Sequence, residues 1–188
     1  MDDRSWASSV LAKLDAKMTY GVQKAQTLNG IPYTVENGEW KSPGIGWWTN
    51  GFWPAEMWQM YLATGKELYR AEALRAETLM DAALKNFNAL HHDVGFLWLI
   101  NSGVHYALEG NADSLNRMLF AGNFLAGRYN PNGFIRAWND KNDGARAGWS
   151  IIDTMMNLPL LYTMSAYTHD PRFSLMARTH ADHVIQNF

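Results

Sequence analysis

Apolar residues recur near the helical repeat in seven segments of the chain. In the first segment Trp6, Val10 and Leu14 fall on one face, and Asp3 or Ser5 can cap the helix start. No strand ladder is expected, so the pattern predicts an all-α protein. The expected helices span residues 3–24, 53–62, 67–87, 96–108, 112–128, 152–167 and 172–186.

The helical pattern is interrupted in three places. Residues 27–50 and 129–148 are rich in Gly, Pro and Asn and predict long loops, although 134–138 could form a short extended piece. Ordered loops of this length are usually functional. The third interruption is Pro159, which we expect to kink the sixth helix because proline removes a backbone hydrogen bond.

A weak internal repeat joins the helices in pairs. Residues 61–69, 106–115 and 162–173 each contain a helix end, a tight turn and a new helix start. Helical hairpins that recur at intervals of about 45 to 60 residues indicate an array that buries its core by stacking neighbours.

The longer segments between the hairpins all lead into helix N-termini, so we expect them to lie at one end of the array. They contain residues 47–50, 91–93 and 146–149. Unpaired backbone N–H groups and the helix dipole favour an anion at such an end. This end is therefore the predicted location of a site.

Composition narrows the classes of partner. The 188-residue chain has a net charge of −2 with both signs scattered, so neither nucleic acid nor an anionic membrane surface is expected as a partner. It has no cysteine, which excludes disulfides and thiolate metal sites. No leader is visible, and no apolar run approaches the roughly 18 residues of a membrane span. We expect one domain over residues 1–188, located in the cytoplasm.

Nine tryptophans are the unusual feature of the composition. A flat aromatic ring can cover the C–H face of a sugar while polar neighbours bind its hydroxyl groups. Trp48 and Trp138 lie in polar loop segments and are candidate sugar platforms, although tryptophans in loops also cover cores. Trp53, Trp58 and Trp98 fall within the helical periodicity and are predicted to be core residues.

Asp153 is a lone carboxylate in an apolar run that continues from Trp149 to Tyr162. Burying an ionised group is costly unless it is paired or hydrogen-bonded. Asp153 is thus a cap, a structural acceptor or a working group in a cleft. Because Ser150 can supply the cap, we favour a working group that hydrogen-bonds to Asn157 while facing a cavity.

Asp93 raises the same question one helix earlier. It can be the N-cap of the fourth helix or part of a site with the neighbouring His91 and His92. Adjacent histidines point to different sides, and no His–Glu spacing completes a helical zinc site. We therefore expect no metal or other cofactor.

Four ordered motifs resemble the unsaturated glucuronyl hydrolases of glycoside hydrolase family 88. The resemblance covers the chain from about residue 47 onward. The motifs are Trp48-Thr-Asn-Gly-Phe-Trp53, His91-His-Asp-Val-Gly-Phe96, Ile135-Arg-Ala-Trp138 and Ile151-Ile-Asp-x-x-x-Asn-Leu-Pro-Leu-Leu161.

The resemblance implies an α/α toroid of six helical hairpins. It also implies removal of a 4,5-unsaturated uronic acid from the non-reducing end of oligosaccharides made by polysaccharide lyases. The family's general acid/base matches Asp153, and its essential companion matches Asp93. Its sugar subsite matches Trp48, His92 and Trp138. The implied chemistry is hydration of the enol ether, with one carboxyl group protonated and its neighbour ionised.

Six hairpins need twelve helices, whereas the pattern predicts seven, and the last one continues to the end of the chain. We therefore expect a toroid that is incomplete at the C-terminus and that can self-associate through its open end. Two alternatives stay open: an unsaturated rhamnogalacturonyl hydrolase, and a non-catalytic carbohydrate-binding helical fragment. The paired histidines before Asp93 favour the glucuronyl family.

Overall fold

The computed structural model describes residues 2–139, 144 and 146–188, which are mostly helical. Helix α1 (Asp3–Ala25) precedes three helical hairpins. The first pairs α2 (Phe52–Thr64) with α3 (Glu67–Leu84), and the third pairs α7 (Leu158–Thr168) with α8 (Pro171–Asn187). The second pairs a helix made of α4 and α5 with α6 (Ala112–Ala126). Helix α4 (Val94–Trp98), a π-helical turn (Leu99–Gly103) and α5 (Val104–Glu109) form one continuous helix. Short 3-10 turns at Trp48–Gly51, Phe87–Ala89 and Ile152–Asn157 precede α2, α4 and α7. With α4 and α5 counted together, the described part of the chain has the seven predicted helices.

The three hairpin turns share one backbone pattern. The first helix of each hairpin ends at a residue with left-handed φ, namely Gly65 (68°), Gly110 (67°) or His169 (58°). An extended residue then starts the second helix, and in two turns its side chain caps that helix, from Asn111 and from Asp170. The predicted internal repeat is therefore confirmed at the level of the backbone.

The expectation of no strands was wrong within the first long loop. Strands β1 (Thr34–Glu36) and β2 (Glu39–Lys41) pair antiparallel, with Val35 opposite Trp40. Asn37 and Gly38 connect them and both have positive φ, 52° and 81°. An Asn-Gly pair favours a two-residue hairpin turn because both residues tolerate this conformation. The signal was present in the sequence but was hidden by the density of loop residues around it.

The predicted kink at Pro159 was also wrong. The expected sixth helix splits into the 3-10 turn Ile152–Asn157 and α7, and Pro159 lies in the first turn of α7. Proline is well tolerated there because the first N–H groups of a helix have no intrahelical partner. Asp153 consequently lies in the 3-10 turn that leads into α7.

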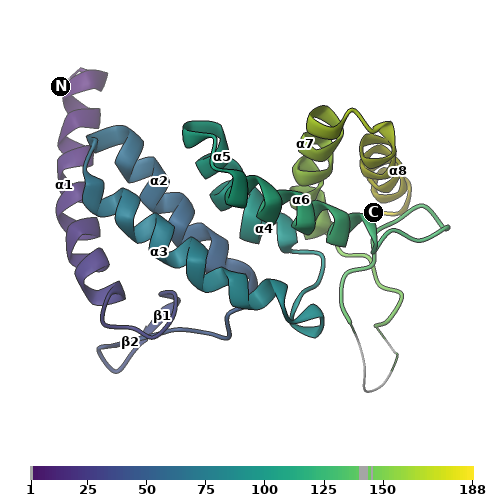
Figure 1. Cartoon of the computed structure of the whole chain (residues 1–188), viewed down its shortest axis with the longest axis horizontal. Coiled ribbons are helices and arrows are strands. Elements are labelled where there is room, and N and C mark those ends of the chain that lie inside the picture. The colour runs from purple at the N-terminus through teal and green to yellow at the C-terminus, as the bar shows by residue number, and fades with distance from the viewer. Residues whose placement is uncertain (1, 140–143, 145) are drawn as a thin grey trace.

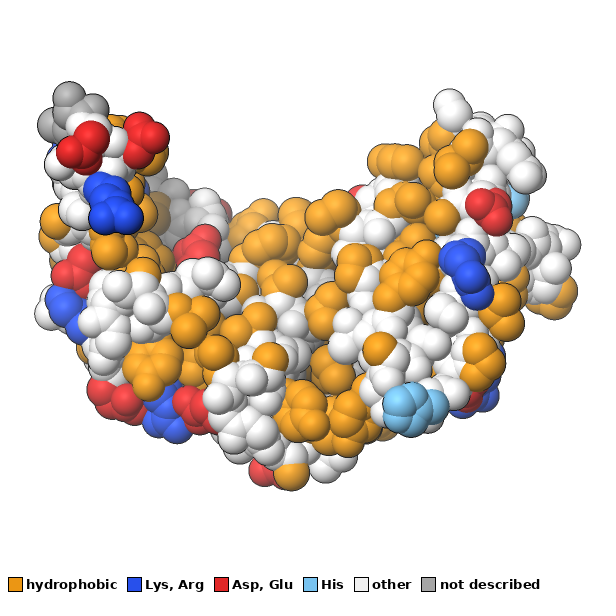
Figure 2. Space-filling model, turned by 90° about the horizontal axis from the view of Figure 1, so that it is seen from above, with side chains coloured by type: hydrophobic (Ala, Val, Ile, Leu, Met, Phe, Trp, Pro, Cys, Tyr) orange, Lys and Arg blue, Asp and Glu red, His pale blue; other side chains and the backbone are white. Residues whose placement is uncertain are grey.

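The hairpins form an open arc around a common core (Figures 1 and 2). Trp58 and Trp98 are completely buried and Trp53 nearly so, as predicted for core residues. The long connections lie along one side of the arc, its lower edge in Figure 1, as the repeat predicted. Among the described residues, no helix has both the length and the apolar character needed to cross a membrane.

Candidate active site

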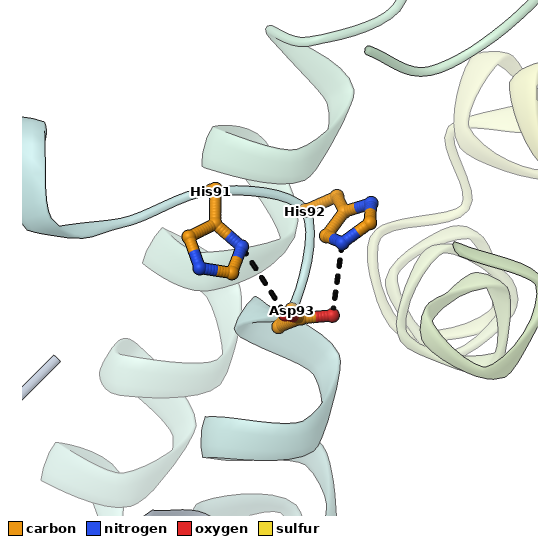
Figure 3. A group of neighbouring side chains, drawn as sticks. All are labelled: His91, His92 and Asp93. Atoms are coloured by element: carbon orange, nitrogen blue, oxygen red, sulfur yellow. Dashed lines mark ion pairs between the residues drawn. The ribbon is translucent and has the colours of Figure 1, made fainter. Parts of the chain in front are cut away.

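Asp93 begins α4 but does not cap it. The residue occupies the N-cap position, yet its carboxylate accepts no hydrogen bond from that helix. The carboxylate is buried and contacts His91 Nδ1 at 3.2 Å and His92 Nε2 at 3.1 Å (Figure 3). Both imidazole nitrogens therefore face the carboxylate of Asp93. The capping alternative is thus wrong, and Asp93 belongs to a polar cluster.

The histidines keep Asp93 ionised. Burial alone raises the pKa of Asp93, but the His91 and His92 rings beside the carboxylate lower it by more. The net result is a pKa well below the usual range for aspartate. Asp93 therefore carries a negative charge across the physiological pH range.

His92 links Asp93 to Asp153. Its buried ring places Nε2 at 3.1 Å from Asp93 Oδ1 and at 3.7 Å from Asp153 Oδ1. The other ring nitrogen, Nδ1, lies 2.7 Å from the hydroxyl of Thr154. When the Thr154 hydroxyl donates to Nδ1, the proton of a neutral imidazole is on Nε2, between the two carboxyl groups. The ring thus bridges the two aspartates.

Asp153 occupies different surroundings from Asp93. Its side chain is 46% exposed, while its Oδ1 is buried and makes no hydrogen bond within the described structure. Burial is the largest effect and raises the pKa of Asp153, and the negative charge of Asp93 also raises it. His92 lowers the pKa but does not cancel these two effects. The two aspartates are therefore shifted in opposite directions, which favours a protonated Asp153 beside an ionised Asp93.

The sequence predicts a hydrogen bond between Asn157 and the carboxyl group of Asp153, but the structure gives Asn157 other partners. Its amide donates to Asp93 Oδ1 (3.3 Å) and to the backbone carbonyl of Asp153 (3.4 Å). Its Oδ1 accepts the N–H of Phe96 at 3.0 Å. This close approach requires Gly95, because a Cβ there would lie 2.6 Å from Asn157 Oδ1. Asn157 therefore joins α4 to the 3-10 turn that carries Asp153.

Ser150 does not supply the cap that we assigned to it. Its hydroxyl is buried and makes no hydrogen bond within the described part of the chain, and the 3-10 turn begins after Ile151. The backbone turn that contains Asp153 is instead closed by the N–H of Thr154, which donates to the carbonyl of Ile151.

Residues 135–139, which we call the strap, carry Trp138 across the site. The N–H of His92 donates to the carbonyl of Ala137, and the N–H of Ala137 donates to the carbonyl of Trp149. The Trp138 ring lies 6.5 Å from the His92 ring and 6.1 Å from the Trp149 ring, between ring centroids. Trp138 is thus placed beside the aspartate pair, as a sugar platform requires.

Trp48 lies in the 3-10 turn before α2, which packs against α4. It is 38% exposed, and its ring centroid lies 5.8 Å from that of Phe96, one turn after Asp93 on α4. Gly51 permits this packing, since a Cβ there would lie 1.9 Å from the carbonyl oxygen of Phe96. The structure thus brings together four of the predicted residues, His92, Asp93, Trp138 and Asp153. It places the fifth, Trp48, against Phe96 on the helix that Asp93 begins.

His91, His92 and Asp93 also form a group whose ligand atoms lie within 4.8 Å of one another. Such a group can in principle hold a metal ion. His91 Nδ1 lies near Asp93 Oδ2, His92 Nε2 lies near Asp93 Oδ1, and His92 Nδ1 contacts the hydroxyl of Thr154. The expectation of no metal stays a prediction.

Sequence reasoning missed several residues that build the site. Thr154 directly follows Asp153 in its motif, so the motif itself could have indicated it. Arg128 and Asn139, which hold the strap, carry no such signal because their partners are backbone groups that only the folded chain brings close.

Known proteins with similar sequences share one activity in their names. The chain is 36% identical over 136 residues to an unsaturated glucuronyl hydrolase of Bacillus sp. strain GL1. It is 31% identical over 137 residues to an unsaturated chondroitin disaccharide hydrolase of Streptococcus pneumoniae. Each alignment covers 71% of this chain, but only 36% and 34% of the respective relative. No family model matches the chain.

Solved structures give the same family. One match is the crystal structure of the unsaturated glucuronyl hydrolase of Bacillus sp. GL1, which is described as responsible for the degradation of glycosaminoglycan. Its TM-score is 0.76, with 29% identity over 87% of this chain and 45% of that chain. A variant described with dGlcA-Glc-Rha-Glc matches with a TM-score of 0.78 and 30% identity, over 87% and 44% of the two chains. These matches confirm the predicted α/α toroid, of which the chain forms a part. The chain spans about a third of the length of the curated relatives it matches. By sequence and fold it belongs to the family of the unsaturated glucuronyl hydrolases.

Proposed function

We propose that the chain carries the acid–base centre of a glycoside hydrolase that removes a 4,5-unsaturated uronic acid from the non-reducing end of lyase-generated oligosaccharides. The observation that carries the proposal is the pair of Asp93 and Asp153, which His92 bridges and whose pKa values shift in opposite directions. A site that needs one protonated and one ionised carboxyl group at the same pH requires such a difference.

Asp153 is the proton donor in this mechanism. Its carboxyl proton passes to carbon 4 of the enol ether, and water adds at carbon 5 of the resulting cation. The water proton returns to the Asp153 carboxylate, and the hemiketal then opens and releases the remaining sugar. Asp93 stays ionised and, by its charge, keeps the proton on Asp153 before the reaction.

The aromatic residues provide the sugar subsite. The Trp138 ring lies beside His92 and the Trp48 ring beside Phe96 on α4, and we assign both rings to the apolar side of the uronate ring. His92, whose ring lies beside Trp138, belongs to the same proposed subsite. The names of the relatives favour disaccharides from chondroitin and other glycosaminoglycans as the first substrates to test.

The test measures loss of the ultraviolet absorbance of the conjugated alkene in an unsaturated chondroitin disaccharide. A saturated glucuronide is the control, because it has no alkene to protonate. We expect turnover of the first compound and none of the second. Equal hydrolysis of both would contradict the hydration mechanism and indicate a conventional glycosidase.

The cytoplasmic location stays a prediction. It follows from the amino-acid sequence alone, and cell fractionation followed by detection of the protein tests it. Recovery of the protein in the culture medium or the periplasm would contradict it.

A further inference from the structure

Arg128 lies just after the C-terminus of α6 and is buried, with 8% of its surface exposed. Its guanidinium donates to the carbonyl of Arg136 (2.8 Å), the carbonyl of Ala137 (2.8 Å) and Oδ1 of Asn139 (2.7 Å). All three acceptors belong to the strap. A buried charge is tolerated only when hydrogen bonds replace its hydration, and the planar fork of arginine suits several acceptors at once.

The strap in turn is bonded to the segment that carries Asp93. The amide of Asn139 donates to the carbonyl of Leu90 at 2.7 Å, and the carbonyl of Ala137 accepts the N–H of His92 at 3.3 Å. Ala137 and Asn139 are therefore each bonded both to Arg128 and to the chain around His92. Trp138 lies between them in sequence.

We propose that Arg128 is a positioning residue of the candidate active site. Its guanidinium hydrogen-bonds to the strap and so fixes Trp138 and the backbone of His92 beside the two aspartates. The proposal rests on the proposed function, because it assigns Trp138 to the sugar subsite. Arg128 acts through these residues and does not itself contact the substrate.

The charge of Arg128 suits this role. Burial and the nearby Arg136 lower the pKa of Arg128 to about 10, and the charge of Asp93 opposes that shift. Arg128 is therefore still protonated at neutral pH, with its N–H groups available to the strap. Lysine would keep the charge, but it cannot reach three acceptors in one plane.

The test compares Arg128→Gln and Arg128→Lys with a matched control, Arg117→Gln. Arg117 is a partly buried arginine on α6 that pairs with Asp81 and lies outside the strap. Three quantities are measured for each variant: the melting temperature, the indole N–H signals in a ¹H–¹⁵N spectrum, and kcat and KM on an unsaturated disaccharide. A Trp138→Phe variant identifies the Trp138 signal.

We expect Arg128→Gln to shift or broaden the Trp138 signal and to raise KM on the order of tenfold, with a smaller loss in kcat because Asp153 lies on another element. Arg128→Lys should fall between wild type and Arg128→Gln. The control should lower the melting temperature without moving the Trp138 signal or KM.

Two results would overturn the proposal. One is an unchanged Trp138 signal and KM in Arg128→Gln, and the other is an equal change in both quantities in Arg117→Gln. If the wild-type chain neither binds nor turns over the disaccharide, the proposed function fails instead. The indole signals still show in that case whether Arg128 holds the strap.

Discussion

At the scale of single residues, Asp93 and Asp153 carry the same chemical group in different surroundings. Asp93 is buried against two imidazoles and the amide of Asn157, whereas Asp153 is half exposed and has an unpaired, buried oxygen. Buried polar atoms normally have partners, and exceptions are frequent where a substrate completes the set. The two environments shift the pKa values of the two groups in opposite directions, as the proposed mechanism requires.

Replacing Asp153 by Asn should remove catalysis and leave the fold. Asparagine keeps the shape but has no proton to deliver, so turnover of an unsaturated disaccharide should fall by about 10²- to 10⁴-fold. The melting temperature should change little, because the side chain is half exposed and, among the described residues, its ion pair is the 3.7 Å contact with His92. Asp182→Asn, on the exposed side of α8, serves as the control. Near-normal turnover in the Asp153 variant would remove it as the catalyst.

Replacing Asp93 by Asn should lower both activity and stability. The variant loses the charge that both histidines face, at a cost of about 1 to 3 kcal/mol for a disrupted buried polar network. The folded pKa of Asp93 lies below its ordinary value of 3.8, so its contribution is present above that pH and is lost as the pH falls further. The difference in urea midpoint between wild type and variant should therefore shrink below about pH 4. An unchanged midpoint at pH 7 would show that Asp93 has no stabilising role.

The sequence was sufficient to propose Asp93, Asp153, Trp48, His92 and Trp138 as candidates, because each lies in a motif or in a run where its type is unexpected. It was not sufficient to assign their partners. The sequence predicts a hydrogen bond from Asn157 to the nearby carboxyl group of Asp153. In the fold the Asn157 amide donates instead to Asp93, which is 64 residues away in sequence. Contacts over such distances depend on how the helices pack, which a single sequence does not state.

At the scale of elements, the helices were predictable because the apolar pattern and the turn residues indicate the same helix ends. Gly65 and Gly110 mark two of the three hairpin turns, and left-handed residues at these positions end helices in a recognisable way. The 3-10 turn before α7 was not predictable, since residues 152–157 have an apolar pattern that suits a helix equally well. Its formation depends on Asn157 bonding to α4.

Helix α8 holds the strap through a buried histidine, which gives stability a pH dependence. His180 Nδ1 accepts the N–H of Ile135 at 3.0 Å. Burial, first, and the neighbouring histidines lower the pKa of His180 from 6.5 to about 4. Between these pH values the unfolded chain binds a proton that the folded chain does not. The contribution of His180 is therefore full above pH 6.5 and is lost as the pH falls toward 4.

The variant His180→Asn should flatten this dependence. The Oδ1 of asparagine can accept the same N–H but does not titrate, so the urea midpoint should fall less steeply between pH 6.5 and pH 4 than in wild type. His169→Asn is the control, because His169 lies in an exposed turn with left-handed φ, which asparagine tolerates. If wild type and His180→Asn lose stability with the same slope, His180 does not titrate on unfolding.

At the scale of the whole molecule, the arc leaves apolar surface uncovered. The first helices of the three hairpins contact one another along the arc, α2 with α5 and α4 with α7. Several large side chains on these helices remain exposed, and Figure 2 shows hydrophobic side chains along the concave side. The exposed large side chains on these helices include Phe52, Leu62, Leu108, Tyr162 and Tyr167. Large exposed apolar patches mark interaction surfaces, so we expect this surface to find a partner.

We predict that the 188-residue chain self-associates through these helices. An interface of roughly 1,000 Å² or more is needed for a specific contact, and a row of apolar side chains on three adjacent helices can provide it. Sedimentation velocity over a range of concentrations should show species larger than a monomer. Leu62→Glu places a charge on α2 and should shift the distribution toward monomer, whereas Ile185→Glu, at a more exposed position on α8, should not. A single monomeric species at all concentrations would contradict the prediction, and an equal effect of the two variants would place the interface elsewhere.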